Sequence, residues 1–296
     1  PHSLECLWTF CSLSAYPIYY IYICLITSQP QKWWHPFCLL LPGILIAAGR
    51  LFSPEGYYDE IQKVFFALQI VCTAYFGIRK LQQFDHKLAH VYADTVGRDT
   101  TAVKHLLIAI VVISIWAFVA NVLGRRFFAQ SDWLLLFISL SFSALQFALG
   151  YIGYNRKFTI EEFVADIKEG DEADAQTEDI ELPSEELEQK LFTLMVKEQY
   201  YLTKNLKIND VALRVQVCRT YLSAHINHHH NCNFSEYVND LRVEHAKRLM
   251  LATAECKMYI VARESGYSTE QAFYRNFQKK TGMKPSEWLA ERQKAQ

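Results

Sequence analysis

The chain has 296 residues, a length that suits two domains, and 51% of them are hydrophobic. Its eight cysteines contain no CxxC pair, which argues against a disulfide framework and favours reduced thiols. The formal net charge of -1 hides an uneven distribution. Residues 1–157 carry 12 basic and 8 acidic side chains, residues 158–183 carry 1 and 10, and residues 184–296 carry 17 and 13. A mildly basic tail is compatible with a polyanionic partner but does not demonstrate one.

The first half of the chain has the pattern of a membrane protein. A helix needs about 20 apolar residues, with a lower limit near 17, to cross the hydrocarbon core. Tryptophan and tyrosine lie at several segment edges, as interfacial anchors do. The alternative is a buried all-α soluble core. The sequence predicts five transmembrane segments, at about 7–27, 37–51, 61–78, 106–123 and 133–154. The second segment is short and contains Pro42 and Gly43.

Basic residues predict the orientation of this half. If the tail is cytoplasmic, the inner loops hold eight Lys and Arg residues and the outer loops hold four, which agrees with the positive-inside rule. Five crossings then place Pro1 outside, and there is no signal peptide with a basic start. We therefore expect a chain that lacks an N-terminal piece, with residues 1–157 as the transmembrane domain.

Residues 158–183 are expected to form an acidic juxtamembrane linker. Thr159 and Glu162 fit a capping box, and apolar residues then recur at helical spacing through Ile167. This short helix would pair with its twin in a homodimer or lie against its own chain. Residues 169–183 have the composition of a disordered segment, either simply solvated or repelling DNA.

From Ser184 onward the pattern is soluble and helical. Leu187, Leu191, Leu194 and Met195 form one apolar stripe, and Asn209 is placed to cap the next helix. A turn near residues 216–218 leads to a second helix, and a long helix follows from Phe234. Residues 260–282 repeat the helix-turn-helix pattern, with Gly266 at the turn, and Pro285 begins a last helix. The sequence predicts an all-α fold, in which a multi-pass helical domain precedes a two-unit helix-turn-helix domain of homeodomain-like type.

Residues 184–296 resemble the DNA-binding domain of the AraC/XylS transcription regulators. The matching stretches are LKINDVALRVQV, YLSAHIN, NFSEYVNDLRVEHAKRLM, IVARESGYS, AFYRNFQKKTG and KPSEW. Gln216 and Asn231 stand where glycine is usual in the family, and asparagine tolerates the left-handed cap conformation. YPIYYIYICLITS and WWHPFCLLLPGIL are similar to the membrane part of a subgroup of these regulators, which implies two further helices upstream.

A recognition helix presents the exposed side chains of its N-terminal part to base edges in the major groove. By family position, Thr220, Ser223 and Ala224 would face bases, and Arg219 a base or a phosphate. In the second unit, Glu270, Gln271 and Arg275 have the chemistry to read cytosine, adenine and guanine. The full set of predicted DNA-binding residues is Arg219, Thr220, Ser223, Ala224, His225, Glu270, Gln271, Tyr274 and Arg275, with Lys279 and Lys280 on phosphates.

Each assignment has a simpler alternative. Gln271 with Ser268 fits a capping box, Glu270 favours the positive end of a helix dipole, and Arg275 suits an ordinary surface position. His225 and His229 have the spacing of two metal ligands on a helix, with Cys232 nearby, but a solvated or phosphate-facing helix end explains them as well. We expect no metal site and no cofactor.

The leading hypothesis is a membrane-bound, sequence-specific transcription regulator that is not an enzyme. It would lie in the bacterial inner membrane with its C-terminal domain in the cytoplasm. Its expected partners are double-stranded DNA, the lipid bilayer, a second copy of the chain and an effector that the membrane half senses. The alternative is a membrane receptor or transporter whose helical tail binds a protein.

Overall fold

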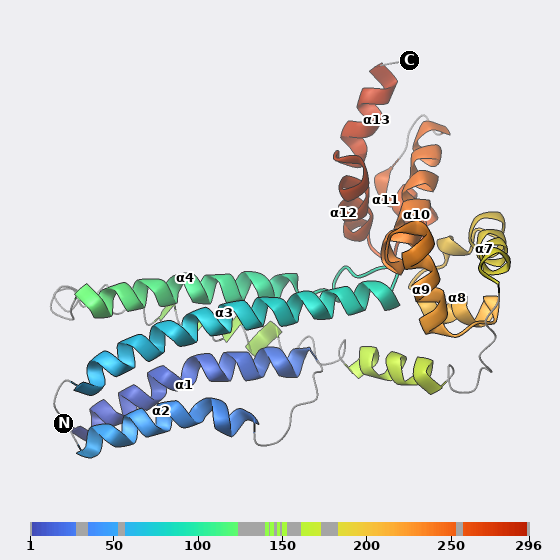
Figure 1. Ribbon diagram of the computed structural model, residues 1–296. Coiled ribbons are helices and arrows are strands. Elements are labelled where there is room, and N and C mark those ends of the chain that lie inside the picture. The colour runs from blue at the N-terminus through green and yellow to red at the C-terminus, as the bar shows by residue number, and fades with distance from the viewer. Residues whose placement is uncertain are drawn as a thin grey trace. The chain divides into compact units, whose positions relative to one another are not determined.

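The computed structural model describes residues 2–27, 35–52, 57–123, 161–172, 183–252 and 257–294, with scattered helical residues between 140 and 152. Within these ranges every regular element is helical, which confirms the predicted all-α class (Figure 1). The chain divides into two compact units. The first comprises Pro1–Phe84 and Thr100–Val164, and the second comprises Asp85–Asp99 and Ala165–Gln296.

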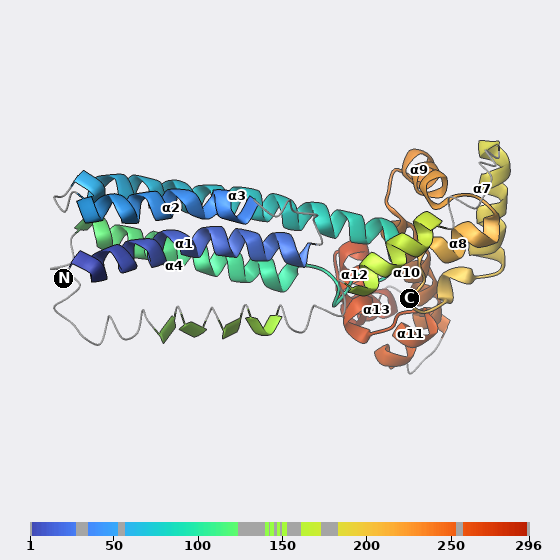
Figure 2. The same cartoon turned by 90° about the horizontal axis from the view of Figure 1, so that it is seen from below.

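The first unit contains long helices that lie side by side in both views (Figures 1 and 2). Ile23 of α1 packs with Leu81 of α3 and Leu107 of α4, and all three side chains are buried. These helices agree with the first four predicted apolar segments, apart from their ends. Their bounds are α1 His2–Ile26, α2 His35–Phe52, α3 Tyr57–Val91 and α4 Thr101–Leu123.

Helix α3 is longer than the apolar segment 61–78 predicts. It continues to Val91 because Leu81, Phe84, Leu88 and Val91 recur at helical spacing and are all buried. Three of the eight basic residues that the charge pattern assigned to inner loops, Arg79, Lys80 and Lys87, therefore lie on a helix.

Large apolar side chains cover the outside of the first unit. Leu25, Val71 and Trp116 are each about two-thirds exposed, at 66%, 65% and 66%. Among the described residues, two helices are long and apolar enough to cross a membrane, in Thr9–Ile26 and Glu60–Val91. Shorter apolar stretches lie in Cys38–Gly49 and Thr101–Trp116. A buried core helix or a signal sequence passes the same test, so two such helices are weak evidence of a membrane.

Two sequence predictions lie partly outside the described residues. Only scattered residues of the fifth apolar segment, 133–154, are described, and those are helical. The predicted capping box includes Thr159, which is not described. The predicted juxtamembrane helix is present over residues 161–172, and it extends into the stretch that the sequence assigns to a disordered linker.

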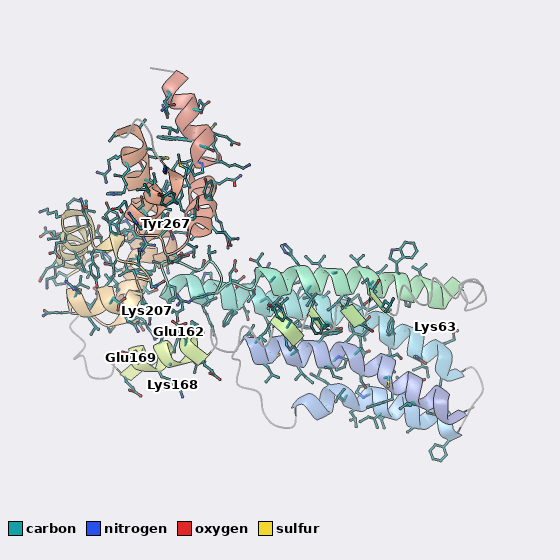
Figure 3. The ribbon with its side chains drawn as sticks, turned by 180° about the vertical axis from the view of Figure 1, so that it is seen from behind. Lys63, Glu162, Lys168, Glu169, Lys207 and Tyr267 are labelled. Atoms are coloured by element: carbon teal, nitrogen blue, oxygen red, sulfur yellow. The ribbon has the colours of Figure 1, made fainter. Side chains whose placement is uncertain are left out.

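The C-terminal part of the second unit consists of short helices around two hydrophobic clusters. Leu187, Leu191 and Ile226 belong to the cluster of the first helix-turn-helix unit, and Phe273 and Phe277 to that of the second. Figure 3 shows Tyr267 among the side chains of this part. The elements are α7 Ser184–Phe192, η1 Thr193–Lys197, η2 Tyr200–Leu202, α8 Ile208–Val215, α9 Arg219–His230, α10 Phe234–Ala252, α11 Met258–Glu264, α12 Glu270–Thr281 and α13 Pro285–Lys294.

The turns of this domain use left-handed backbone conformations. Gln216 ends α8 at φ 60° and Asn231 ends α9 at φ 52°, so both residues adopt the conformation for which the family prefers glycine. Asn209 does not cap α8 as predicted, because the helix already begins at Ile208. The Asp210 carboxylate instead accepts from the Lys207 amide at the start of the helix, at 2.9 Å.

Helix α10 joins the two helix-turn-helix units through a buried arginine. Arg242 is fully buried, and it donates to the carbonyl oxygens of Tyr201 at 2.7 Å and Thr203 at 2.8 Å. Its guanidinium also lies over the ring of Tyr267, in the turn of the second helix-turn-helix unit. Burial lowers the pKa of this guanidinium from its usual value. One side chain therefore holds both η2, which precedes the first helix-turn-helix unit, and the turn of the second helix-turn-helix unit.

Candidate nucleic-acid interface

The first recognition helix, α9, has one buried and one open side. Leu222 and Ile226 are fully buried, whereas Thr220 and Ala224 are exposed and Ser223 is half-buried. The Cys218 sulfur accepts from the amide of Tyr221 at the start of the helix. The predicted exposure of Thr220 and Ala224 is therefore confirmed, and Ser223 is partly covered.

His225 does not lie on the open side of α9, so its predicted exposure is wrong. Only 6% of the residue is exposed, and its Nε2 lies 2.9 Å from a carboxylate oxygen of Glu188 on α7. Its ring stacks on that of His229. Burial alone would raise the pKa of Glu188, but the hydrogen bond with His225 and the charge of His230 lower it. His225 therefore connects α9 to α7 instead of facing a ligand.

A capping box with Ser268 as the N-cap would require the second recognition helix, α12, to begin at residue 269, but it begins one residue later, at Glu270. Thr269 is the N-cap, and its hydroxyl accepts from the Ala272 amide at 3.2 Å. Ser268 instead donates to a carboxylate oxygen of Asp94 at 2.6 Å. The Gln271 capping alternative is therefore wrong, and the exposed Gln271 side chain is available to a ligand.

Three predicted readers of the second unit share the open side of α12. Glu270, Gln271 and Arg275 are exposed, as predicted. Tyr274 is half-buried, because its ring packs edge-on against Phe273. Ala272, Phe273 and Phe277 are buried and form the core side of this helix.

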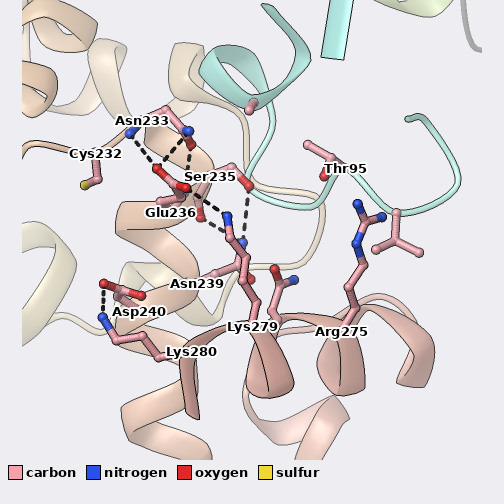
Figure 4. Close-up of a pocket in the computed structure, with 13 residues that line it drawn as sticks. Thr95, Cys232, Asn233, Ser235, Glu236, Asn239, Asp240, Arg275, Lys279 and Lys280 are labelled. Atoms are coloured by element: carbon pink, nitrogen blue, oxygen red, sulfur yellow. Dashed lines mark hydrogen bonds and ion pairs between the residues drawn. The ribbon is translucent and has the colours of Figure 1, made fainter. Parts of the chain in front are cut away.

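The two lysines near the end of α12 contact α10. Lys279 donates to Glu236 at 2.8 Å, and Lys280 donates to Asp240. The hydrogen bond from Lys279 lowers the pKa of Glu236. Both pairs border a polar cavity of about 310 Å³ that Arg275 and Thr95 also line (Figure 4). The ends of these side chains are therefore held by carboxylates, while the lysines themselves stay exposed.

Residues 85–99, which precede the predicted DNA-binding domain by a long stretch of sequence, belong to the same compact unit. Ala93 is fully buried in the cluster of the first helix-turn-helix unit, and Val96 packs against that of the second. The Ala93 amide donates to the Leu206 carbonyl at 3.0 Å, and the Ala93 carbonyl accepts from Ser235 and Asn239. The sequence predicted none of this, because helical periodicity does not reveal which distant segment covers a hydrophobic cluster.

This segment also contacts predicted DNA-binding residues. Asp99 accepts from Arg275 Nη1 at 2.5 Å, and His90 Nδ1 lies 3.2 Å from Ser223 Oγ. In the helix 161–172, Asp171 accepts from Arg219 Nη2 at 2.6 Å. Both arginines of the predicted reading surface are thus paired with aspartates from outside residues 184–296.

The histidines of α9 do not form a metal site in the part of the chain that is described. No group of three or more His, Cys, Asp and Glu side chains with metal-binding geometry occurs among these residues. His225 is instead hydrogen-bonded to Glu188, and His229 lies 2.7 Å from the Ser184 hydroxyl.

Comparisons with known proteins identify the C-terminal region. Residues 211–291 match the family model described as a helix-turn-helix domain. The structure of a protein with unknown function from Listeria innocua is 24% identical, and the match covers 34% of this chain and 93% of that chain with a TM-score of 0.31. No curated protein matches the chain. Domains of this type occur in DNA-binding regulators, which are generally not enzymes. Residues 211–291 are therefore similar to AraC-type helix-turn-helix domains, which supports a sequence-specific DNA-binding transcription regulator.

Proposed function

We propose that the chain is a membrane-anchored transcription regulator that binds operator DNA through both helix-turn-helix units. The observation that carries the DNA-binding part is the AraC-type domain at 211–291, with two recognition helices that pack on one linking helix, α10. Two such helices enter successive turns of the major groove, about 34 Å apart. Thr220, Ala224, Gln271 and Arg275 would meet base edges, and Lys279 and Lys280 phosphates.

Membrane anchoring is supported by the apolar outer surface of the first unit. Monomeric soluble proteins rarely expose contiguous apolar patches of more than a few hundred Å². Leu25, Val71 and Trp116 belong to three different helices and are each about two-thirds exposed. In this proposal the first unit crosses the bacterial inner membrane, the DNA-binding unit lies in the cytoplasm, and an effector or a second copy of the chain controls it.

DNA selection tests the first part of the proposal. The full chain, reconstituted in lipid nanodiscs, is mixed with a pool of random-sequence duplexes, and the bound fraction is amplified and sequenced. We expect one enriched sequence with two half-sites, and an affinity that falls steeply with salt because phosphate contacts release counterions. Binding without any enriched sequence would contradict a sequence-specific regulator.

Membrane extraction tests the second part. The chain is expressed in bacteria, and the membrane fraction is washed with alkaline carbonate, which removes peripheral proteins. We expect the chain to stay in the pellet and to be released only by detergent. Release by carbonate alone would contradict anchoring and leave the DNA-binding proposal intact.

A further inference from the structure

We propose that residues 85–99, together with the helix 161–172, form an autoinhibitory clamp that occupies the DNA-reading surface. This inference rests on the proposed function and adds its regulation. DNA presents negative charge to arginine, and the carboxylates of Asp99 and Asp171 present the same charge to Arg275 and Arg219. The clamp and the DNA therefore compete for the same two guanidinium groups.

The clamp reaches both recognition helices. On α12, Asp99 pairs with Arg275, and Asp94 accepts from Ser268 in the turn before the helix. On α9, His90 lies within hydrogen-bonding distance of Ser223, and Asp171 pairs with Arg219. Three predicted DNA-binding residues, Arg219, Ser223 and Arg275, are therefore engaged by groups that DNA would have to displace.

Buried contacts hold the clamp in position. Ala93 is fully buried, and its carbonyl accepts from Asn239 at 2.6 Å and from Ser235 at 2.8 Å. The Tyr92 hydroxyl donates to Asp166 at 2.5 Å, and Lys207 pairs with the same carboxylate at 2.8 Å. These contacts join residues 85–99 to the helix 161–172, so the two parts of the clamp are linked.

The exposed ends of the clamp are weaker than this anchor. The side chain of Arg275 is 53% exposed and that of its partner Asp99 14%, whereas the side chain of Asp171 is 62% exposed and that of its partner Arg219 16%. Solvent therefore reaches one side chain of each ion pair and weakens the pair. Such pairs can be exchanged for contacts with DNA while Ala93 stays buried. The clamp thus lowers DNA affinity without abolishing it, which suits a regulator that must respond to a signal.

Helix α3 supplies a covalent route for that signal. It runs without a break from Tyr57 in the first unit to Val91, directly before the anchoring residues Tyr92 and Ala93. A displacement of the C-terminal end of α3 would change how firmly Asp99 holds Arg275. The signal would thereby shift the population between clamped and open recognition helices.

Neutralising one aspartate tests the clamp in the full chain. The probe is a duplex that both the wild-type and the Asp99→Asn protein enrich from the random pool. The affinity of each protein, in nanodiscs, for this duplex is measured by fluorescence anisotropy. Asp99→Asn should tighten binding about two- to fivefold, the range expected for an exposed ion pair. The control Glu198→Gln removes an equal charge from an exposed site outside both helix-turn-helix units and should leave affinity unchanged.

A double-mutant cycle separates competition from general charge repulsion. In the Arg275→Ala background, Asp99→Asn should give no gain, because the group that it releases is absent. Asp171→Asn and Arg219→Ala form a second, independent cycle with the same expectation. Equal affinity of wild type and both aspartate variants, or a gain that persists in the alanine backgrounds, would overturn the clamp. Absence of sequence-preferring DNA binding by every variant would instead overturn the proposed function.

Discussion

Arg242 on α10 donates from Nε to the carbonyl oxygen of Tyr201, 41 positions earlier in the chain, at 2.7 Å. The same guanidinium donates to Thr203 and covers the ring of Tyr267. This arrangement fixes η2, which precedes the first helix-turn-helix unit, relative to the turn of the second helix-turn-helix unit. Two recognition helices can read one DNA site only if their spacing is fixed, and Arg242 is placed to fix it.

Arg242→Met should destabilise the DNA-binding unit by about 2–4 kcal/mol, because it leaves the buried carbonyl group of Tyr201 without this donor and removes the bond to Thr203. Pulse proteolysis of the full chain in urea, which follows the loss of the folded C-terminal region, measures the effect. The control Arg248→Met changes an exposed residue on the same helix and should shift the midpoint little. Equal shifts for the two variants would show that Arg242 has no special role.

Gly266→Ala should destabilise the same unit by about 3 kcal/mol, through left-handed strain and overpacking. Gly266 has φ 80°, and a Cβ there would lie 2.7 Å from the Leu202 Cα, which cannot move as a flexible side chain can. Gly282→Ala is the matched control, since it has φ 78° and nothing within 4 Å of its added Cβ. It should cost about 1 kcal/mol. Similar losses in pulse proteolysis would contradict the close approach of Gly266 to Leu202.

Gln216→Gly should stabilise the first helix-turn-helix unit by about 0.5 kcal/mol. The left-handed conformation of Gln216 costs about 1 kcal/mol, and the extra entropy of glycine in the unfolded chain offsets part of the gain. Asn231→Gly should change stability less, because asparagine tolerates this conformation. A loss of stability in Gln216→Gly would show that the Gln216 side chain contributes more than its backbone strain costs.

Stability of the DNA-binding unit should fall as the pH drops below about 6.5, the ordinary pKa of histidine. Burial and the charge of Arg248 lower the pKa of His245, whose Nδ1 lies 3.1 Å from the Tyr201 hydroxyl. The unfolded chain then binds the proton more readily than the folded chain, so acid favours unfolding. His245→Gln should reduce the change in urea midpoint between about pH 7.5 and about pH 5.5. An identical change in wild type and variant would contradict this role of His245.

Arg275→Ala and Lys279→Ala should affect DNA binding in different ways. Loss of a bidentate arginine contact removes about 1–3 kcal/mol of discrimination at one base pair. Loss of a phosphate contact weakens binding to all sequences and reduces its salt dependence. Anisotropy titrations with the selected duplex and single-base variants of it measure both. Unchanged sequence preference in Arg275→Ala would contradict the base-reading assignment of this residue.

Local sequence patterns predicted most elements of the DNA-binding domain. The apolar spacing predicted the long helix α10, because helical periodicity depends on neighbours within a few residues. The readers Gln271 and Arg275 followed from the family resemblance, and both are exposed. The errors concern the exact start of a helix and the side of a helix on which a residue lies. Thr269 rather than Ser268 caps α12, and His225 lies on the buried side of α9 because Glu188 on α7 provides a partner.

Periodicity and turn residues were thus sufficient to predict the all-α class and the two helix-turn-helix units, and the family resemblance added the exposed readers on α12. What covers that surface is visible only in the folded chain. Asp99 meets Arg275 across 176 positions, and Asp94 meets Ser268 across 174. No local pattern encodes such pairs, because they depend on how Ala93 and Val96 fill space in two hydrophobic clusters formed by residues far along the chain.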